Sequence, residues 1–267
     1  MKVAVSGAAG RMGKRILALA NEHPSMTIVG ALEAPGFRGI GKDAGEVAGI
    51  GKLGVLISDK LKPVLAACDV LIEFSAPEPS LEHIKAAAGA GKAIVVGTTG
   101  FSEQQRKEIA QAGKKTRCLV APNMSPGVNL LFNLAQRVAS ALGSEYDVEI
   151  IEAHHRMKKD APSGTAVKLA EVISKALGRD YASVGVHGRK GLVGERTPQE
   201  IGVMAVRGGD IVGEHTVMFV TTGERLELVH RAHSRDALAK GAIQAALWLA
   251  SQPNGLYDMQ DVLGLKG

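Results

Sequence analysis

The sequence predicts an α/β protein with a doubly wound parallel sheet, followed by a second, α+β domain. Up to about residue 122, short β-branched apolar runs alternate with helical stretches, which is the pattern of a parallel sheet with crossover helices. The first of these runs leads directly into a glycine-rich turn. Beyond residue 123 the apolar spacing becomes that of long helices and alternating strands.

Six strands and four helices are expected before residue 122. The strands are the apolar runs 2–6, 26–32, 55–58, 70–74, 93–96 and 118–121, and the helices are 11–22, 60–67, 79–89 and 102–112. Residues 34–54 differ, because they contain seven glycines and little periodicity. We expect a loop there, at one edge of the sheet.

The periodicity of the second part predicts both helices and strands. We expect helices over 128–142 and 165–177, and strands over 147–152, 201–207, 215–222 and 224–230. We interpret the last three strands as antiparallel, with a turn at Arg207-Gly208-Gly209-Asp210. An alanine-rich helix over 236–250 follows them. The expected domains are therefore 1–125 and 126–234.

The composition excludes several classes of protein. Of 267 residues, 45% are hydrophobic and 22% are charged, which excludes a disordered or collagenous chain. No apolar run reaches the roughly 18 residues of a membrane span, and the N-terminal run is too short for a signal-peptide core. The net charge of +5 is spread along the chain and aromatic residues make up only 3%, so we expect a small anion rather than nucleic acid or membrane as the partner. Cys68 and Cys118 are not needed as a disulfide, so a cytoplasmic setting is expected.

The glycine turn is Gly7-Ala8-Ala9-Gly10-Arg11-Met12-Gly13. Glycines allow a tight turn and a close approach to a pyrophosphate, whose charge is stabilised by the free N–H groups of a helix start. Glu33 follows the second strand, 20 residues beyond Gly13, where an acid can accept hydrogen bonds from the adenosine ribose. The sequence therefore predicts a dinucleotide site at this turn; the alternative is a plain glycine turn beside an exposed Glu.

Two further segments follow strands and are expected at the same edge of the sheet. Gly97-Thr98-Thr99-Gly100 follows the fifth strand, and Ala121-Pro122-Asn123-Met124-Ser125 follows the sixth. Ligands of open α/β sheets bind outside the carboxyl ends of the strands. We expect these segments to line a nicotinamide pocket; the alternative is that they are ordinary polar loops.

The segment 152–165 contains five basic or titratable side chains within six residues, 154–159, and ends in Pro162-Ser163-Gly164-Thr165 at an expected helix start. Basic side chains bind carboxylates, and the N–H groups of Gly164 and Thr165 offer a second anion site. His154 and Lys158 are candidate proton donors, because histidine titrates near neutrality and neighbouring cations lower the pKa of a lysine. The segment predicts an anionic substrate.

The same side chains allow other interpretations. A basic loop is often only a solvated loop. A metal site of Glu152, His154 and His155 is disfavoured because adjacent strand residues point to opposite faces, so no metal is expected. Neither cysteine lies in a CxxC pair or beside a basic motif, which disfavours a thiol nucleophile. Structural roles are expected for the single histidines His187, His215, His230 and His233.

Together these segments resemble the 4-hydroxy-tetrahydrodipicolinate reductase family, also called dihydrodipicolinate reductase. The resemblance covers the whole chain in order, through Gly7–Gly13, Glu33, Gly97–Gly100, Asn123-Met124-Ser125-Pro126-Gly127-Val128-Asn129, Glu152–Thr165 and Arg207-Gly208-Gly209-Asp210-Ile211-Val212-Gly213-Glu214-His215. The His-His-Arg-x-Lys…Ser-Gly-Thr segment is the specific part of it, since glycine turns occur in many dehydrogenases.

The resemblance implies a Rossmann domain, a substrate domain with a mixed sheet, a C-terminal part (235–267) that returns to the first domain, and a homotetramer. The implied reaction is reduction of a small dicarboxylate by NADH or NADPH in lysine biosynthesis. His154 and Lys158 occupy the catalytic positions, and the substrate-binding positions are His155, Ser163, Gly164 and Thr165. The implied dinucleotide contacts are Gly7, Ala8, Ala9, Gly10, Arg11, Met12, Glu33, Gly97, Thr98, Thr99, Ala121, Pro122, Asn123 and Met124.

One position departs from a common form of the family pattern. Many members have Arg directly after the acid of strand two, where it holds the 2′-phosphate of NADPH, and this chain has Ala34. We therefore expect NADH to be preferred, or both cofactors to be used. Two rival functions stay open at this point: a dehydrogenase of another small carboxylate, and a dinucleotide-binding sensor without catalysis.

Overall fold

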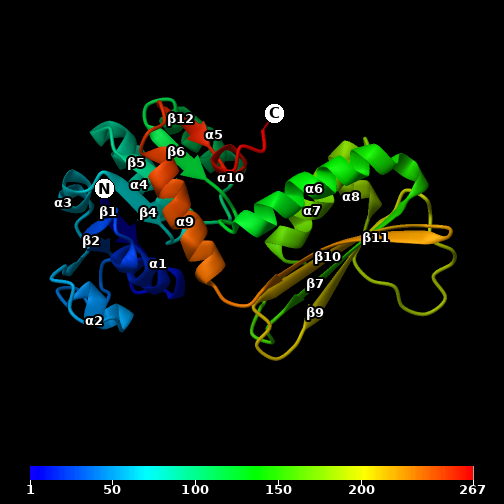
Figure 1. The fold of residues 1–267 in the computed structure, drawn as a ribbon, viewed down its shortest axis with the longest axis horizontal. Coiled ribbons are helices and arrows are strands. Elements are labelled where there is room, and N and C mark those ends of the chain that lie inside the picture. Colours follow the sequence, from blue (N-terminus) through cyan, green and yellow to red (C-terminus); the bar gives the residue numbers. More distant parts are fainter. Residues whose placement is uncertain (267) are drawn as a thin grey trace. The chain divides into compact units, whose positions relative to one another are not determined.

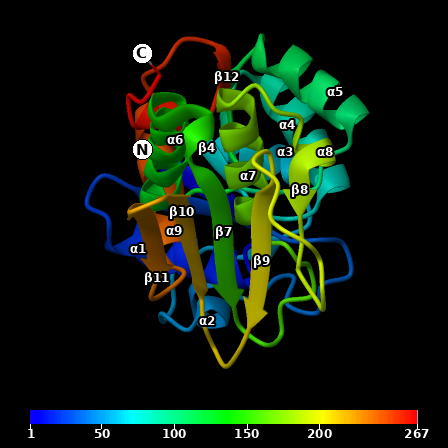
Figure 2. The same ribbon diagram turned by 90° about the vertical axis from the view of Figure 1, so that its right-hand side faces the viewer.

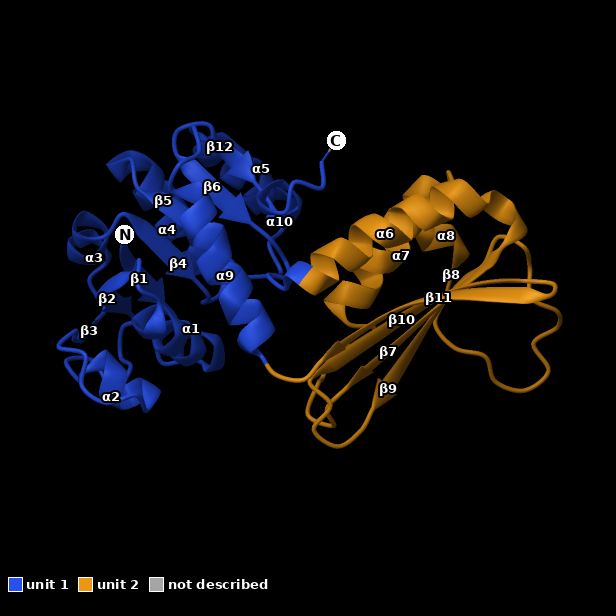
Figure 3. Ribbon diagram, in the orientation of Figure 1, with its two compact units in different colours: residues 1–126, 235–267 blue, residues 127–234 orange. Residues whose placement is uncertain are grey.

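The computed structural model describes residues 1–266, which form two compact units. Unit 1 contains residues 1–126 together with the C-terminal segment from residue 235, and unit 2 contains residues 127–234 (Figure 3). Among the described residues, no helix combines the length and the apolar character needed to cross a membrane.

Unit 1 is built on a parallel sheet whose strand order is β12-β6-β5-β4-β1-β2-β3 (Figure 1). Its strands are β1 (Lys2–Ser6), β2 (Thr27–Leu32), β3 (Ile57–Ser58), β4 (Val70–Glu73), β5 (Ala93–Val96), β6 (Arg117–Val120) and β12 (Gly255–Tyr257). From β1 the chain proceeds to β2 and β3 on one side and to β4, β5 and β6 on the other. The doubly wound sheet is confirmed, and its strand order reverses between β1 and β4.

Helices pack on both faces of this sheet because its strands are apolar on both sides. Val3 and Val5 of β1 face a core shared with α1 (Arg11–Glu22) and α9 (Asp236–Leu249). Ala4, between them, faces the opposite core. That core is shared with α3 (Leu61–Ala67), α4 (Pro77–Ala90) and α5 (Glu103–Gly113).

The expectation of a loop over 34–54 is wrong in part, because a short helix, α2 (Ala44–Ala48), lies there. The buried Asp43 carboxylate caps it by accepting hydrogen bonds from the N–H groups of Gly45, Glu46, Leu53 and Gly54. The C-terminal segment also adds two elements that the pattern did not predict, β12 and α10 (Met259–Val262).

Unit 2 has a mixed sheet of order β11-β10-β7-β9-β8. Figure 2 shows β11, β10, β7 and β9 side by side. The strands are β7 (Asp147–His154), β8 (Gly185–Val186), β9 (Ile201–Arg207), β10 (Gly213–Thr221) and β11 (Glu224–Ala232). The helices are α6 (Pro126–Leu142), α7 (Gly164–Ala176) and α8 (Tyr181–Val184), and both α6 and α7 pack on the same core.

The expectation that 201–207 is antiparallel is wrong. β9 pairs in parallel with β7 and β8, whereas β10 is antiparallel to β7 and β11. Since β7 lies between β9 and β10, the glycine turn after Arg207 carries the chain past the end of β7 instead of closing a hairpin.

A prediction about stability follows from the packing of α9. A Cβ atom at Gly241 would lie 1.8 Å from the Met124 carbonyl oxygen, so we expect Gly241→Ala to reduce the free energy of unfolding by about 1–3 kcal/mol. Gly89→Ala is the matched control, because Gly89 is also helical and nothing lies within 4 Å of its Cβ position. That control should be neutral or stabilising by up to about 1 kcal/mol. Urea unfolding measures both, and equal effects would contradict the close approach.

Candidate active site

The glycine turn in unit 1 depends on two close approaches of the backbone. Gly7 has φ +71°, and a Cβ atom there would lie 2.3 Å from the Phe74 carbonyl oxygen. A Cβ atom at Gly13 would lie 2.1 Å from the Gly7 carbonyl oxygen. Gly7 and Ala8 donate their N–H groups to the Leu32 carbonyl at 3.0 and 3.2 Å. The turn is therefore held between β4, α1 and the end of β2.

Glu33 lies beside this turn and is fixed to it. Its Oε1 accepts the Ala9 N–H at 2.8 Å, and its Oε2 accepts the Ala34 N–H at 3.1 Å. A carboxylate offers about four acceptor sites, so capacity for two ribose hydroxyls is left. The acid, the glycine turn and the start of α1 lie together at the carboxyl ends of the strands, as a dinucleotide requires.

Segments 97–100 and 121–125 follow β5 and β6 at the carboxyl ends of the strands. Some of their side chains are exposed and others are buried. Thr99 and Pro122 are exposed, whereas Thr98, Ala121 and Met124 are buried. Contacts of these buried residues with a dinucleotide would therefore be made mainly by their backbone. Gly97 lies against the Phe74 ring, since a Cβ atom there would be 2.2 Å from a ring carbon.

In unit 2, a fully buried carboxylate, Glu152, organises the end of β7. Arg207 donates to both of its oxygens, at 2.7 and 2.8 Å. His154 Nδ1 lies 2.6 Å from Oε2, and the Ser163 N–H donates to Oε1 at 3.0 Å. Burial alone would raise the pKa of Glu152, but the hydrogen bonds from Arg207 and His154 outweigh it and hold this pKa below its ordinary value. Glu152 therefore stays ionised and links β7, β9 and the start of α7.

His154 is oriented by this carboxylate. Because ionised Glu152 can only accept, Nδ1 of His154 carries a proton and Nε2 is left for other chemistry. Burial lowers the pKa of His154, an effect that Glu152 partly offsets and that the charge of Lys158 adds to. The imidazole is thus neutral near pH 7.

His215 packs against His154, with ring centroids 5.3 Å apart in an edge-to-face contact. Its Nε2 lies 3.1 Å from the hydroxyl oxygen of Ser163, which caps α7 by accepting the Ala166 N–H. Burial lowers the pKa of His215 to about 3. This side chain is therefore a neutral support beneath His154 and Ser163.

Lys158 lies in the loop between β7 and α7 and binds a carboxylate. Its Nζ donates to the Asp160 oxygens at 3.0 and 2.8 Å, so its closest charged partner is an anion and not the cations that the sequence pattern suggested. α7 begins at Gly164, and nothing lies within 4 Å of a Cβ position there. Open space beside a helix N-terminus suits a carboxylate.

Comparison with known proteins identifies the family. The model of the dihydrodipicolinate reductase N-terminus matches residues 1–124, and that of the dihydrodipicolinate reductase C-terminus matches residues 127–263. The chain belongs to the dihydrodipicolinate reductase family. The resemblance inferred from the motifs is confirmed.

Similar proteins agree with this assignment. The 4-hydroxy-tetrahydrodipicolinate reductases of Citrifermentans bemidjiense and Geobacter metallireducens are 53% and 54% identical to this chain, with 100% of each chain covered. A dipicolinate-bound dihydrodipicolinate reductase from Paenisporosarcina sp. TG-14 shares the fold, with a TM-score of 0.77, 23% identity and 98% of each chain covered. An amine dehydrogenase from Mycobacterium smegmatis also resembles the fold, with a TM-score of 0.60, 13% identity and coverage of 96% and 94%.

The sequence pattern did not predict the roles of two side chains in the unit 2 site, since it indicates Glu152 only as a possible metal ligand and Arg207 only as part of a turn. For His215 it predicts a structural role, which agrees with its position against His154 and Ser163. One signal was available, because Glu152 and His154 are two residues apart on a strand and so share a face. Among residues 1–266, no cluster of His, Cys, Asp or Glu has the arrangement of a metal site.

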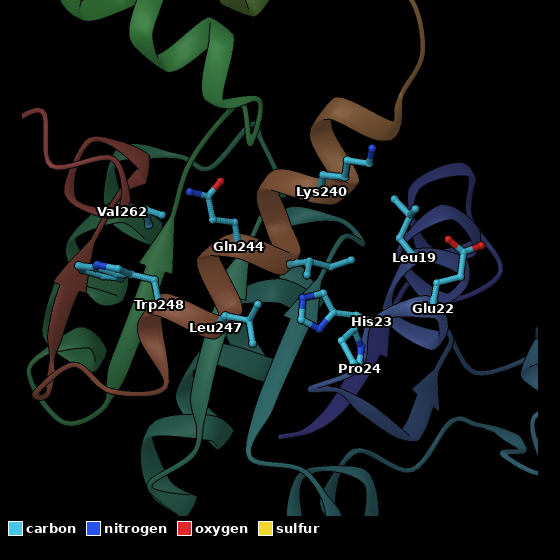
Figure 4. Close-up of a pocket in the computed structure, with 10 residues that line it drawn as sticks. Leu19, Glu22, His23, Pro24, Lys240, Gln244, Leu247, Trp248 and Val262 are labelled. Atoms are coloured by element: carbon cyan, nitrogen blue, oxygen red, sulfur yellow. The ribbon is translucent and has the colours of Figure 1, made fainter.

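A surface pocket of about 650 Å³ lies in unit 1 between α1 and α9 (Figure 4). Its walls are mainly apolar and include Leu19, Leu247 and Trp248. Leu19 lies near the C-terminal end of α1, whereas the glycine turn precedes the N-terminal end. None of the predicted dinucleotide residues lines this pocket, so we assign it no part in the reaction.

The buried His215 predicts a loss of stability in mild acid. Its folded pKa of about 3 lies below the ordinary value of 6.5, so protons bind preferentially to the unfolded chain as the pH falls from 6.5 toward 3. One such group removes about 2 kcal/mol of unfolding free energy between pH 7 and pH 5. We expect His215→Gln, whose amide can still bond Ser163, to lose about 2 kcal/mol less over this interval in urea unfolding. Equal losses in parent and variant would contradict a neutral, buried His215.

Proposed function

We infer that the chain is an NAD(P)H-dependent 4-hydroxy-tetrahydrodipicolinate reductase of lysine and diaminopimelate biosynthesis. The assignment is supported by family matches over both units and by identities of 53–54% over the full length. Within the structure, the observation that carries it is the Glu152 cluster, which orients His154 beside the start of α7. The direct test is oxidation of NADH or NADPH with and without the product of dihydrodipicolinate synthase.

We propose that unit 1 binds the dinucleotide and that unit 2 binds the substrate. The glycine turn, Glu33 and the segments 97–99 and 121–124 of unit 1 would hold the dinucleotide, which supplies the hydride when bound. The substrate would be held by unit 2. His155, Gly164 and Thr165 would bind its carboxylates, because a helix N-terminus and a cationic loop favour anions. The buried Ser163 would contribute by capping α7, because its N–H is bonded to Glu152 and its hydroxyl to His215 and the Ala166 N–H.

Lys158 is the proposed proton donor and His154 its partner. An ammonium group has three donors, so Lys158 can release one hydrogen bond to Asp160 and offer a proton to the substrate. His154 Nε2 is fixed in direction because Nδ1 is bound to Glu152. Together with Arg156, the Lys158 ammonium group would stabilise negative charge that develops on the substrate ring, which is commonly a large term in such reactions.

The proposed cofactor preference is NADH, or both cofactors. The carboxylate of Glu33 is suited to the free 2′-hydroxyl of NADH and opposes the negative charge of a 2′-phosphate. Its orientation is fixed by the Ala9 N–H, and the next residue, Ala34, provides no compensating cation.

We also propose a homotetramer in the cytoplasm. One face of the unit 2 sheet is covered by α6 and α7, and the other carries apolar side chains. In the described structure Ile151 is 36% exposed, Val206 48% and Val229 43%. Ile151 and Val229 lie in register on either side of Thr216, so a second copy could cover these apolar side chains. The cytoplasmic part of the proposal is supported by the two free cysteines, Cys68 and Cys118, which are both buried.

Loss of the proposed proton donor should affect chemistry more than cofactor binding. We expect Lys158→Ala to lower kcat by about 10²–10⁴-fold, or about 3–5 kcal/mol of barrier, while the KM for NADH changes little. Lys159→Ala is the matched control, since Lys159 is the exposed neighbour in the same loop. Steady-state kinetics decides, and a Lys158 variant within threefold of the parent would remove Lys158 from the mechanism.

The cofactor preference is tested at positions 33 and 34. We expect the parent to favour NADH by about five- to thirty-fold in kcat/KM, the size of one charged hydrogen bond gained or lost. Ala34→Arg should shift the ratio toward NADPH, and Glu33→Ala should weaken NADH more than NADPH. Both cofactors are compared at fixed ionic strength. A parent that favours NADPH more than tenfold would show that Arg11 or Arg38 dominates instead.

A further inference from the structure

A second buried carboxylate, Glu73, lies in unit 1 and has no part in the chemistry proposed above. Glu73 ends β4 and is 0% exposed, and it lies in register with Ser6 at the end of β1. The strand order of the sheet reverses between these two strands. Ligands of open α/β sheets bind outside the sheet at this reversal, so Glu73 lies at the edge of the sheet where a dinucleotide is expected.

The carboxylate of Glu73 is surrounded by hydrogen-bonding groups. His83 of α4 binds Oε2 through Nδ1. Oε1 accepts the Ser75 N–H at 2.8 Å, and the hydroxyl of Ser80 lies 3.2 Å from it. Burial would raise the pKa of Glu73, but the bond to His83 and the other hydrogen bonds keep this pKa below its ordinary value.

This cluster is connected to the proposed cofactor segment 97–99. The Ser80 and Thr98 hydroxyls are hydrogen-bonded to each other at 2.7 Å, and both side chains are buried. The Gly97 N–H donates to the Glu73 carbonyl at 2.9 Å. On the other side, the Ser6 hydroxyl lies 3.4 Å from His83 Nδ1, and Gly7 follows Ser6 directly. Side chains from the ends of β1, β4 and β5 thus meet on α4.

An apolar cluster could fill this space without the cost of burying a charge. Replacing a buried ion pair by apolar groups of similar volume is often neutral or stabilising. Hydrogen bonds differ from apolar contacts in being directional, so they fix the loops after β1, β4 and β5 relative to one another. Because these loops carry the glycine turn and segment 97–99, the cluster sets the shape of the dinucleotide site.

We propose that Glu73 and His83 are positioning residues for the dinucleotide, acting through Ser80 and Thr98 on the loop that follows β5. This rests on the proposed function, in which that loop contacts NADH. Neither side chain touches the cofactor. The pair of Glu73 and His83 determines how well the loops after β1 and β5 fit the dinucleotide.

The test compares two replacements of His83. His83→Ala removes the partner of Glu73, and we expect the dissociation constant of NADH, measured by calorimetry, to rise about tenfold. In His83→Asn the side-chain amide can donate from near the position of Nδ1, so NADH binding should return to within about threefold of the parent. The KM for the dicarboxylate should stay within about twofold in both variants, because its proposed site is in unit 2.

Lys85→Ala is the matched control, because Lys85 lies two residues further along α4 and forms an exposed ion pair with Glu108. We expect it to leave NADH binding unchanged. Should His83→Ala fail to fold, Ser80→Ala decides, because it keeps the pair of Glu73 and His83 but removes the hydroxyl that joins Glu73 and Ser75 to Thr98. It should weaken NADH binding about threefold.

Two results would overturn the proposal: a lower melting temperature without weaker NADH binding, or an asparagine variant no better than the alanine variant. A parent that binds NADH but does not reduce the dicarboxylate would instead contradict the proposed function. In that case the comparison of dissociation constants still decides the role of His83.

Discussion

The hydrogen bonds of the Glu152 carboxylate are the interactions on which the candidate substrate site of unit 2 depends. This carboxylate is fully buried, and a buried charge is stable only when it is paired and hydrogen-bonded. Its partners come from three places in the chain: His154 on its own strand, Arg207 on the neighbouring strand and Ser163 at the start of α7. The loop that carries Lys158 is therefore fixed at both ends, by His154 and by Ser163.

In unit 1, the loops at the carboxyl ends of the strands are held in position by close packing as well as by polar contacts. Phe74 is central, because its carbonyl excludes a side chain at Gly7 and its ring excludes one at Gly97. Two loops of the proposed dinucleotide site thus lie against a single residue at the end of β4. Beneath them the Glu73 cluster adds directional contacts. Apolar packing determines how close the loops lie, and hydrogen bonds determine their orientation.

The sequence predicted best those elements whose stability is local or whose burial is uniform. β1, β5 and α1 were placed to the residue because apolar runs and a glycine turn mark them. α2 was missed because the Asp43 cap that holds it draws on N–H groups as far along the chain as Gly54. The direction of β9 could not be read from alternation, since its pairing depends on β7, about fifty residues earlier.

In the candidate site, too, features that are contiguous in the chain could be predicted and contacts between distant residues could not. The family and the reductase activity could be inferred from motifs, because Gly7–Gly13 and 152–165 are contiguous in the chain. The role of Arg207 and the contact between His215 and His154 could not, because they join strands that are distant in sequence. The individual roles of the dinucleotide and substrate residues stay predictions.

The return of the C-terminal segment to unit 1 makes unit 2 an insertion within the first unit, with a consequence for biosynthesis on the ribosome. Ala242, Ile243 and Leu249 of α9 belong to the same core as β1 and α1. That core is incomplete until α9 has been synthesised, whereas every residue of unit 2 has been added by residue 234. The nascent chain can thus bury the core of the inserted unit first, while one apolar face of the parallel sheet stays incompletely covered until α9 has been synthesised.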